Sequence, residues 1–163
     1  MKRFWIWSLL AAGLALGGVL PLKTHDVAEL EPAHILLIWT ENGTVRTRTD
    51  SGAEGAGASL EAALADMEER AVGVLFLDTA EHVLLQGNAR ALMQALAESQ
   101  RLRPAAKIYL AQTLPEDAEQ AAAYLKTHAG RTTLGMVRAA LLRAETVRLP
   151  HARVEEGSIC RIE

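Results

Sequence analysis

The sequence has very little cysteine and few aromatic residues. Cys160 is the single cysteine among 163 residues, which excludes an intrachain disulfide and any metal site that needs several thiolates. Phe, Trp and Tyr together make up 4% of the chain, although 50% of its residues are hydrophobic. Alanine and leucine therefore provide most of the apolar surface, a composition typical of packed helices around a few aliphatic strands.

An excess of positive charge is also missing. The chain has 17 Lys and Arg residues against 20 Asp and Glu residues, a formal net charge of −3. Proteins that bind nucleic acids concentrate basic side chains on one face, so we expect no nucleic acid as a partner. The length leaves room for one ordinary domain of roughly 100 to 150 residues after a targeting segment.

One long hydrophobic run is present, at the start of the chain. Lys2 and Arg3 precede an uncharged stretch from Phe4 to Leu20. Its 17 residues lie between the ~7 to 15 of a secretory hydrophobic core and the ~20 that span a bilayer. Because the basic residues stay on the cytoplasmic side, we expect the chain after Lys23 to lie outside the cytoplasm.

Two features of this run indicate different fates. Trp5 and Trp7 resemble the interfacial anchors of a retained helix, whereas Ala15-Leu16-Gly17 has the small residues that a signal peptidase prefers. We expect residues 1–22 to be a membrane anchor, with a cleaved signal peptide as the alternative. Residues 23–32 are expected to be a polar linker.

Residues 33–163 are predicted to form a single α/β (α+β-like) domain, with a mixed β-sheet covered by helices. Asn42-Gly43 favours the positive φ angles of a tight hairpin turn between an apolar strand and a β-branched one. The expected strands are 34–39, 44–49, 74–77, 82–85, 107–111, 146–154 and 158–162.

Four helices are expected between these strands. The Ser59 hydroxyl can cap the first, Asn88 opens the second, and the last two cover 116–127 and 133–143. The run from Ala139 to Leu142 is apolar enough to bind a partner helix, but core packing is the commoner use of such a run. Helical spacing places these residues on inward faces: Leu60, Ala63, Leu64, Met67, Ala91, Leu92, Ala95, Leu96, Leu134, Val137 and Leu141.

Few side chains have the spacing that catalysis, phosphate binding or metal binding requires. Gly52, Gly55 and Gly57 resemble a phosphate loop, but the Gly-Lys-Ser/Thr ending is absent, so residues 51–58 are interpreted as a flexible connector. Cys160 is expected to be a packed or inert thiol. None of the five histidines has a metal-binding spacing such as H-x-x-x-H, and adjacent acids on a helix usually form its solvated face. We therefore predict no catalytic residue, cofactor or metal ion. This prediction covers the histidines His25, His34, His82, His128 and His151 and the acids Asp66, Glu68 and Glu69.

Asp78 and His82 form the one candidate cleft for a ligand or partner. Asp78 follows an apolar strand, a position where catalytic acids often lie in α/β folds. No lysine or second acidic cluster accompanies it, so an aspartate that initiates a turn is the simpler interpretation. We keep the pair as a candidate binding site, not as a catalytic one.

Taken in order, these elements resemble the N-terminal domain of the C subunits of spore germinant receptors, the Ger(x)C family. An acidic stretch and an Ile-rich strand follow the export segment at 26–30 and 35–39. A helix then opens with Ser59-Leu60-Glu61-Ala62-Ala63-Leu64, and Leu75-Phe76-Leu77 is followed by a turn and a strand that begins at His82. Leu149-Pro150 matches a later element of the family. The likeness lies in the order of these motifs, since none is diagnostic by itself.

The chain departs from that family in two places. Family members usually carry a lipid-modified cysteine just after the hydrophobic run, where this sequence has Leu20-Pro21-Leu22. They also continue into further domains, whereas this sequence ends at Glu163. The resemblance therefore implies a short, single-domain relative without the lipid anchor.

We expect a non-enzymatic, membrane-tethered accessory or scaffold protein that acts outside the cytoplasm on a protein partner. The resemblance adds a setting in spore germination or sporulation. Two alternatives stay open: a secreted domain that binds a small molecule or peptide, and a ring-forming adaptor of sporulation.

Overall fold

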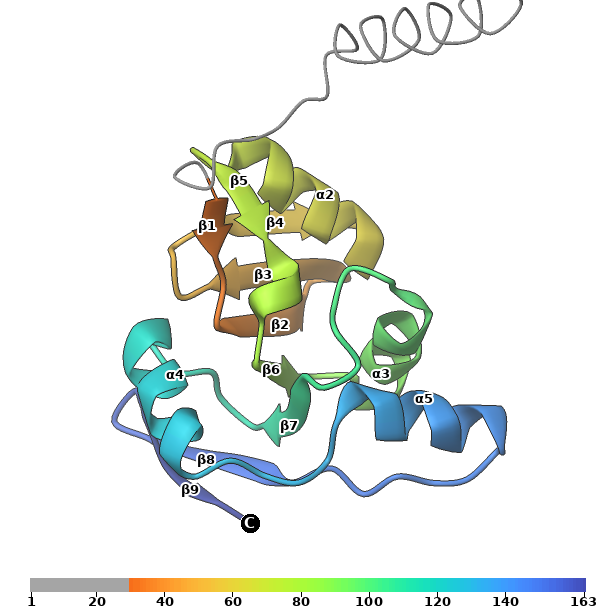
Figure 1. The fold of residues 1–163 in the computed structure, drawn as a ribbon. Coiled ribbons are helices and arrows are strands. Elements are labelled where there is room, and N and C mark those ends of the chain that lie inside the picture. The colour runs from red at the N-terminus through yellow and green to blue at the C-terminus, as the bar shows by residue number, and fades with distance from the viewer. Residues whose placement is uncertain (1–29) are drawn as a thin grey trace, which may run out of the picture.

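A computed structural model describes residues 30–163, and the expected anchor at residues 1–22 lies outside this range. The described residues form a mixed α/β fold around a seven-stranded sheet, in the order β4-β3-β2-β6-β7-β8-β9 (Figure 1). The strands of this sheet are β2 Ile35–Glu41, β3 Thr44–Thr49, β4 Glu54–Gly57, β6 His82–Gln86, β7 Lys107–Ala111, β8 His151–Glu155 and β9 Ser158–Ile162.

The sheet has a parallel centre and antiparallel edges. Strands β2, β6, β7 and β8 are parallel neighbours, while β3 and β4 at one edge and β9 at the other pair antiparallel. The predicted hairpin is confirmed: Asn42 and Gly43, with φ of 50° and 79°, join β2 to β3. Both angles are those of the tight turn that this dipeptide favours.

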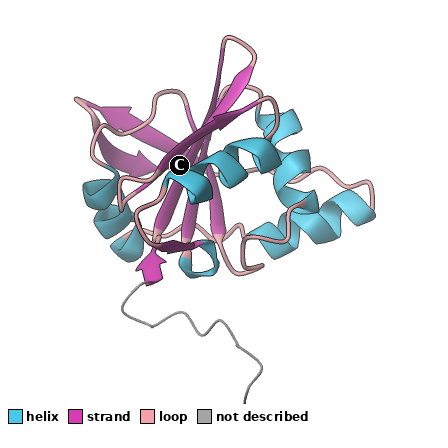
Figure 2. Cartoon of the chain, turned by 90° about the horizontal axis from the view of Figure 1, so that it is seen from above, coloured by secondary structure: helices cyan, strands magenta, loops and turns pink. Residues whose placement is uncertain are grey.

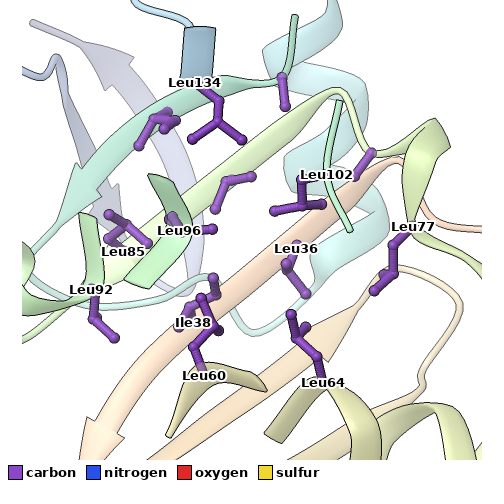
Figure 3. Close-up of a cluster of buried hydrophobic side chains, with 14 of the residues drawn as sticks. Leu36, Ile38, Leu60, Leu64, Leu77, Leu85, Leu92, Leu96, Leu102 and Leu134 are labelled. Atoms are coloured by element: carbon purple, nitrogen blue, oxygen red, sulfur yellow. The ribbon is translucent and has the colours of Figure 1, made fainter. Parts of the chain in front are cut away.

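Helices cover both faces of the sheet, because side chains alternate along each strand. Leu36 and Ile38 of β2 belong to one buried cluster with residues of three helices, α2 Leu60–Arg70, α3 Ala89–Glu98 and α5 Leu134–Leu142 (Figure 3). Ile35 and Leu37 belong to a second cluster, with α4 Ala118–Thr127. Figure 2 shows helices on either side of the strands.

The first helix forms as its sequence predicts. The Ser59 hydroxyl accepts a hydrogen bond from the Ala62 N–H at 3.2 Å and so caps α2. Its predicted stripe is buried, with Leu60, Ala63, Leu64 and Met67 at most 2% exposed. The other N-cap residues are Asn88, Asp117 and Thr133.

The expected flexible connector at residues 51–58 is wrong, because its second half is strand β4. Gly55 and Gly57 lie against α2, where a Cβ atom added at Gly55 would come within 2.2 Å of the Ala63 carbonyl oxygen. The glycines therefore let a helix and a strand approach closely. Small residues in this segment allow close packing and do not indicate flexibility.

Two further boundaries differ from the expected ones. The last three residues of the expected linker form β1 Leu30–Pro32, which pairs in parallel with β5 Val74–Phe76 in a separate two-stranded sheet. The buried strand expected at 74–77 is shorter and only partly buried: Phe76 is 42% exposed, and a 3-10 turn, η2 Leu77–Thr79, follows it. Thr79 fixes this turn, since its hydroxyl donates to the Ala33 carbonyl at 2.9 Å.

Two residues of the predicted helical stripes are exposed, and a third, Ala95, is only partly buried. Ala91 is exposed at the start of α3, while Leu92 and Leu96 enter the core. Leu141 is 46% exposed, while Leu134 and Val137 of the same stripe are buried. Within residues 30–163, no helix combines the length and apolar character that a bilayer span requires.

Candidate functional site

The structure places Asp78 and His82 in different environments. Asp78 is exposed on η2, whereas His82 begins the central strand β6 and is 2% exposed. No hydrogen bond or ion pair joins the two among the described residues. Neither residue lines the hollows described below.

His82 is instead part of a buried polar pair. Its Nδ1 atom lies 3.3 Å from the Tyr109 hydroxyl, which accepts a hydrogen bond from the Gly130 N–H at 3.0 Å. The Tyr109 hydroxyl can therefore donate to Nδ1, which leaves the His82 proton on Nε2. That nitrogen is buried and has no hydrogen-bond partner within residues 30–163.

Burial keeps this histidine neutral. It lowers the pKa of His82 to about 4, with the positive charge of Lys107 adding to the effect. Glu81 opposes the shift only weakly, since its carboxylate is 4.0 Å from Nε2 and also pairs with Arg103 at 3.4 Å. Burial likewise raises the pKa of Tyr109. A neutral, enclosed pair of this kind offers no open position for a substrate.

An apolar surface lies elsewhere, on α5 and the chain that follows it. Met136 is 53% exposed and Leu142 is 89% exposed, although both are large hydrophobic residues. With Leu141, three of the nine residues of α5 expose apolar side chains. The expectation that Ala139–Leu142 packs in the core therefore holds only for the buried Ala140.

Two hollows flank this helix and share one wall. The larger, of about 750 Å³, lies between α5 and the chain before β8; its lining includes Pro104, Gly135, Met136, Ala139, Thr146 and Arg148. The second, of about 490 Å³, is lined by Met93 of α3, Val137 and Leu141. Glu145, Thr146 and Val147 line both hollows.

The shared wall is a connector, residues 144–150, that runs from the end of α5 back to β8 without helix or strand (Figure 1). Ala144, with φ of 54°, turns the chain out of the helix, and the Glu145 N–H donates to the Ala140 carbonyl at 2.8 Å. At the far end the Pro150 carbonyl accepts from the Leu110 N–H at 2.9 Å. The connector is therefore held at both ends.

The rim of these hollows is basic in a molecule that is otherwise acidic. Residues 1–29 hold three of the basic and two of the acidic residues, so the described part has 14 Lys and Arg against 18 Asp and Glu. Arg90, Arg143 and Arg148 line the two hollows, whereas Glu145 is the one acid among their lining residues. Glu145 is already paired with Arg143 at 3.2 Å.

The remaining sequence candidates are dispersed. His34 is exposed and pairs with Asp50 at 2.8 Å, and His128 stacks on Tyr124. Cys160 is exposed on β9, so the expectation of a packed thiol is wrong. Among residues 30–163, no three His, Cys, Asp or Glu side chains gather in a way that could hold a metal ion; His25 lies outside that range.

No family model, curated protein or solved structure matches the chain.

The sequence indicates that Ala139–Leu142 is apolar enough to bind a partner helix, but it favours core packing, because an apolar run has the same pattern whether it is buried or exposed. One signal was present: Leu141 and Leu142 are adjacent, and neighbouring positions on a helix face about 100° apart. Four consecutive apolar residues are more than one buried stripe can use.

Proposed function

We propose that this chain is a membrane-tethered, extracytoplasmic adaptor that binds a partner protein through the surface around α5. The observation that carries the proposal is the exposed apolar surface of that helix: Met136 lines the larger hollow, Leu141 lines the second, and Leu142 is 89% exposed at the C-terminal end of the helix. Large apolar side chains that gather at one exposed place mark interaction surfaces more often than isolated ones do. The basic rim supplies charge that can select the partner.

The tether is inferred from the sequence of residues 4–20, and its orientation from Lys2 and Arg3. An adaptor needs no catalytic group, which agrees with the enclosed, neutral state of His82. It does need a rigid surface, and α5 supplies one because Leu134 and Val137 belong to the same buried cluster as residues of the sheet.

The position of the domain can be tested with the natural thiol. Cys160 is the single cysteine of the chain and is exposed on β9. We expect a maleimide reagent that cannot cross membranes to label it in intact protoplasts as fully as in lysed ones. Labelling only after lysis would place the domain in the cytoplasm and refute the proposed location.

The binding surface can be tested by site-specific photocrosslinking in cells that produce the protein naturally. A photoreactive residue at Leu142 should give a discrete adduct with one protein, whereas the same residue at Glu119, which is exposed on α4, should not. The adduct should disappear when Met136→Glu is added, because a charge then enters the apolar face. Equal crosslinking from both positions, or an adduct that survives Met136→Glu, would show that α5 is not the interface.

The biological setting follows only from the resemblance to the Ger(x)C family. We propose a role in spore germination or sporulation, for which deletion of the gene is the direct test. Normal spore formation and normal nutrient germination in the deletion strain would remove this setting without affecting the adaptor proposal. An adduct with a second copy of the chain, together with an oligomer in light scattering, would identify a ring-forming adaptor instead.

A further inference from the structure

The connector after α5 carries a feature that the proposed adaptor role does not by itself require. We propose that Thr146–Arg148 is a docking strand, and that its occupant is an extended segment of the partner protein with apolar and acidic side chains. This inference rests on the proposed function, since it describes how the partner binds. It commits to an extended segment, whereas the apolar face alone would suit a helix equally well.

The main chain of Thr146–Arg148 is open for pairing. Among the described residues, no hydrogen bond involves the backbone N–H or C=O groups of these three positions. Thr146 and Arg148 are exposed and Val147 is half-buried, so solvent or another chain can reach the segment. An unpaired main chain beside a hollow is what an added strand recognises, since its own N–H and C=O groups then find partners.

The larger hollow provides room for the side chains of that segment. It lies between the connector and α5, and its α5 wall presents Gly135, Met136 and Ala139. Gly135 packs against Pro104, whose carbonyl oxygen would lie 3.2 Å from an added Cβ atom, whereas the small side chain of Ala139 leaves space beside the helix. The hollow has a volume of about 750 Å³ and is largely open to solvent, so side chains of another chain can enter it from the surface. Apolar side chains of an extended segment therefore fit between the connector and the helix.

The charges select an acidic segment. Arg148 lies at the connector itself and has no ion-pair partner within residues 30–163, and Arg90 and Arg143 line the hollows further along. The rest of the described part is acidic, so a basic segment would be attracted elsewhere on the molecule. An extended segment with alternating apolar residues and flanking Asp or Glu fits both the hollow and its rim.

Selection from a library of random twelve-residue peptides tests this inference without knowledge of the partner. The target is the full-length chain, held in a mild detergent because of its apolar segment at residues 4–20. We expect enriched peptides with apolar residues at alternate positions and with Asp or Glu beside them. Their affinity is then measured by fluorescence polarisation for the natural chain and for its variants.

Two variants have matched controls. Thr146→Pro removes one backbone N–H of the docking strand, while Thr146→Ala removes the side chain and keeps the N–H; we expect at least tenfold weaker binding for the first and little change for the second. Ala139→Glu places a charge in the larger hollow and should abolish binding. Ala123→Glu, on an exposed position of α4, should not. Circular dichroism verifies that each variant is folded.

The outcomes separate this inference from the proposed function. Peptides with apolar residues three and four positions apart, which lose affinity in Ala139→Glu but bind Thr146→Pro normally, would indicate a helical partner; the adaptor proposal would stand and the docking strand would not. Peptides insensitive to both substitutions, or a selection without enrichment, would overturn the docking strand. The crosslinking result at Leu142 then decides the proposed function independently.

Discussion

The buried histidine makes the stability of the domain depend on pH in a way that can be measured. The pKa of His82 is about 4 in the folded chain, against 6.5 for an unperturbed histidine. Between these values the unfolded chain binds a proton that the folded chain does not, so the free energy of unfolding falls as the pH is lowered from 6.5 to 4. Above pH 6.5 His82 is neutral in both states and contributes no slope.

The size of the effect follows from that difference in pKa. A difference of about 2.5 pKa units, at 1.36 kcal/mol per unit, corresponds to about 3 kcal/mol. That is a large part of the roughly 5 to 15 kcal/mol that stabilises an ordinary domain. In the steepest part of the transition, around pH 5 to 6, one proton gives a slope of about 1.4 kcal/mol per pH unit.

Urea unfolding at several pH values between 5 and 7.5 measures this slope. The chain from residue 24 onward is suitable, because Trp39 is then its single tryptophan and packs against the same buried cluster as Tyr109. Carboxylates also titrate in this range, so the informative quantity is a difference between variants. His82→Phe removes the titrating group and keeps an aromatic ring of similar size.

We expect the unfolding free energy to change less steeply with pH for His82→Phe than for the natural chain. The difference in slope should be close to the value for one proton. His128→Gln is the matched control, because it removes an exposed histidine instead of a buried one. If the natural chain and His82→Phe lose stability in parallel as the pH falls, His82 is not the buried neutral group described above and the reasoning fails.

Three further predictions concern packing. Gly55→Ala should destabilise the domain by about 1 to 3 kcal/mol, because the new methyl group would overlap the main chain of α2; urea unfolding measures this, and an unchanged midpoint would show that β4 and α2 are not in close contact. Ser59→Ala should cost about 1 kcal/mol through loss of the N-cap of α2, while Ser158→Ala, whose hydroxyl contacts only the exposed Gln120 side chain, should change the midpoint little. Leu142→Ser should leave thermal stability within about 0.5 kcal/mol, because an exposed side chain away from the core contributes little to folding; a loss of 2 kcal/mol or more would mean that Leu142 is buried.

The strands and helices of this domain are largely predictable because each carries a local signal. Asn42-Gly43 defines the hairpin, and Ser59 and Asn88 mark helix starts through side chains that reach the following N–H groups. The role of the small residues could not be predicted from the sequence. Gly55 and Gly57 are equally suited to a flexible loop and to a strand pressed against a helix, and only the neighbour that arrives from elsewhere in the chain decides between them.

The candidate site was less predictable, for a related reason. The sequence predicts a cleft shared by His82 and Asp78, which follows an apolar strand, but the environment of His82 depends on Tyr109 and Gly130, which lie 27 and 48 positions further along the chain. His82 is buried in the core and does not line a surface cleft. The α5 surface is the opposite case. Its apolar run would normally be buried, but too few residues pack against it to cover it.

The order of the strands has a consequence for how the chain reaches its final state. β8 is the last parallel strand along the chain and begins forty positions after the end of its neighbour β7, and β9 then pairs with β8 alone. Until β8 has left the ribosome, β7 presents an open edge, the kind of feature that invites aggregation. A chain that ends before β8 would therefore expose the β7 edge to aggregation and proteolysis.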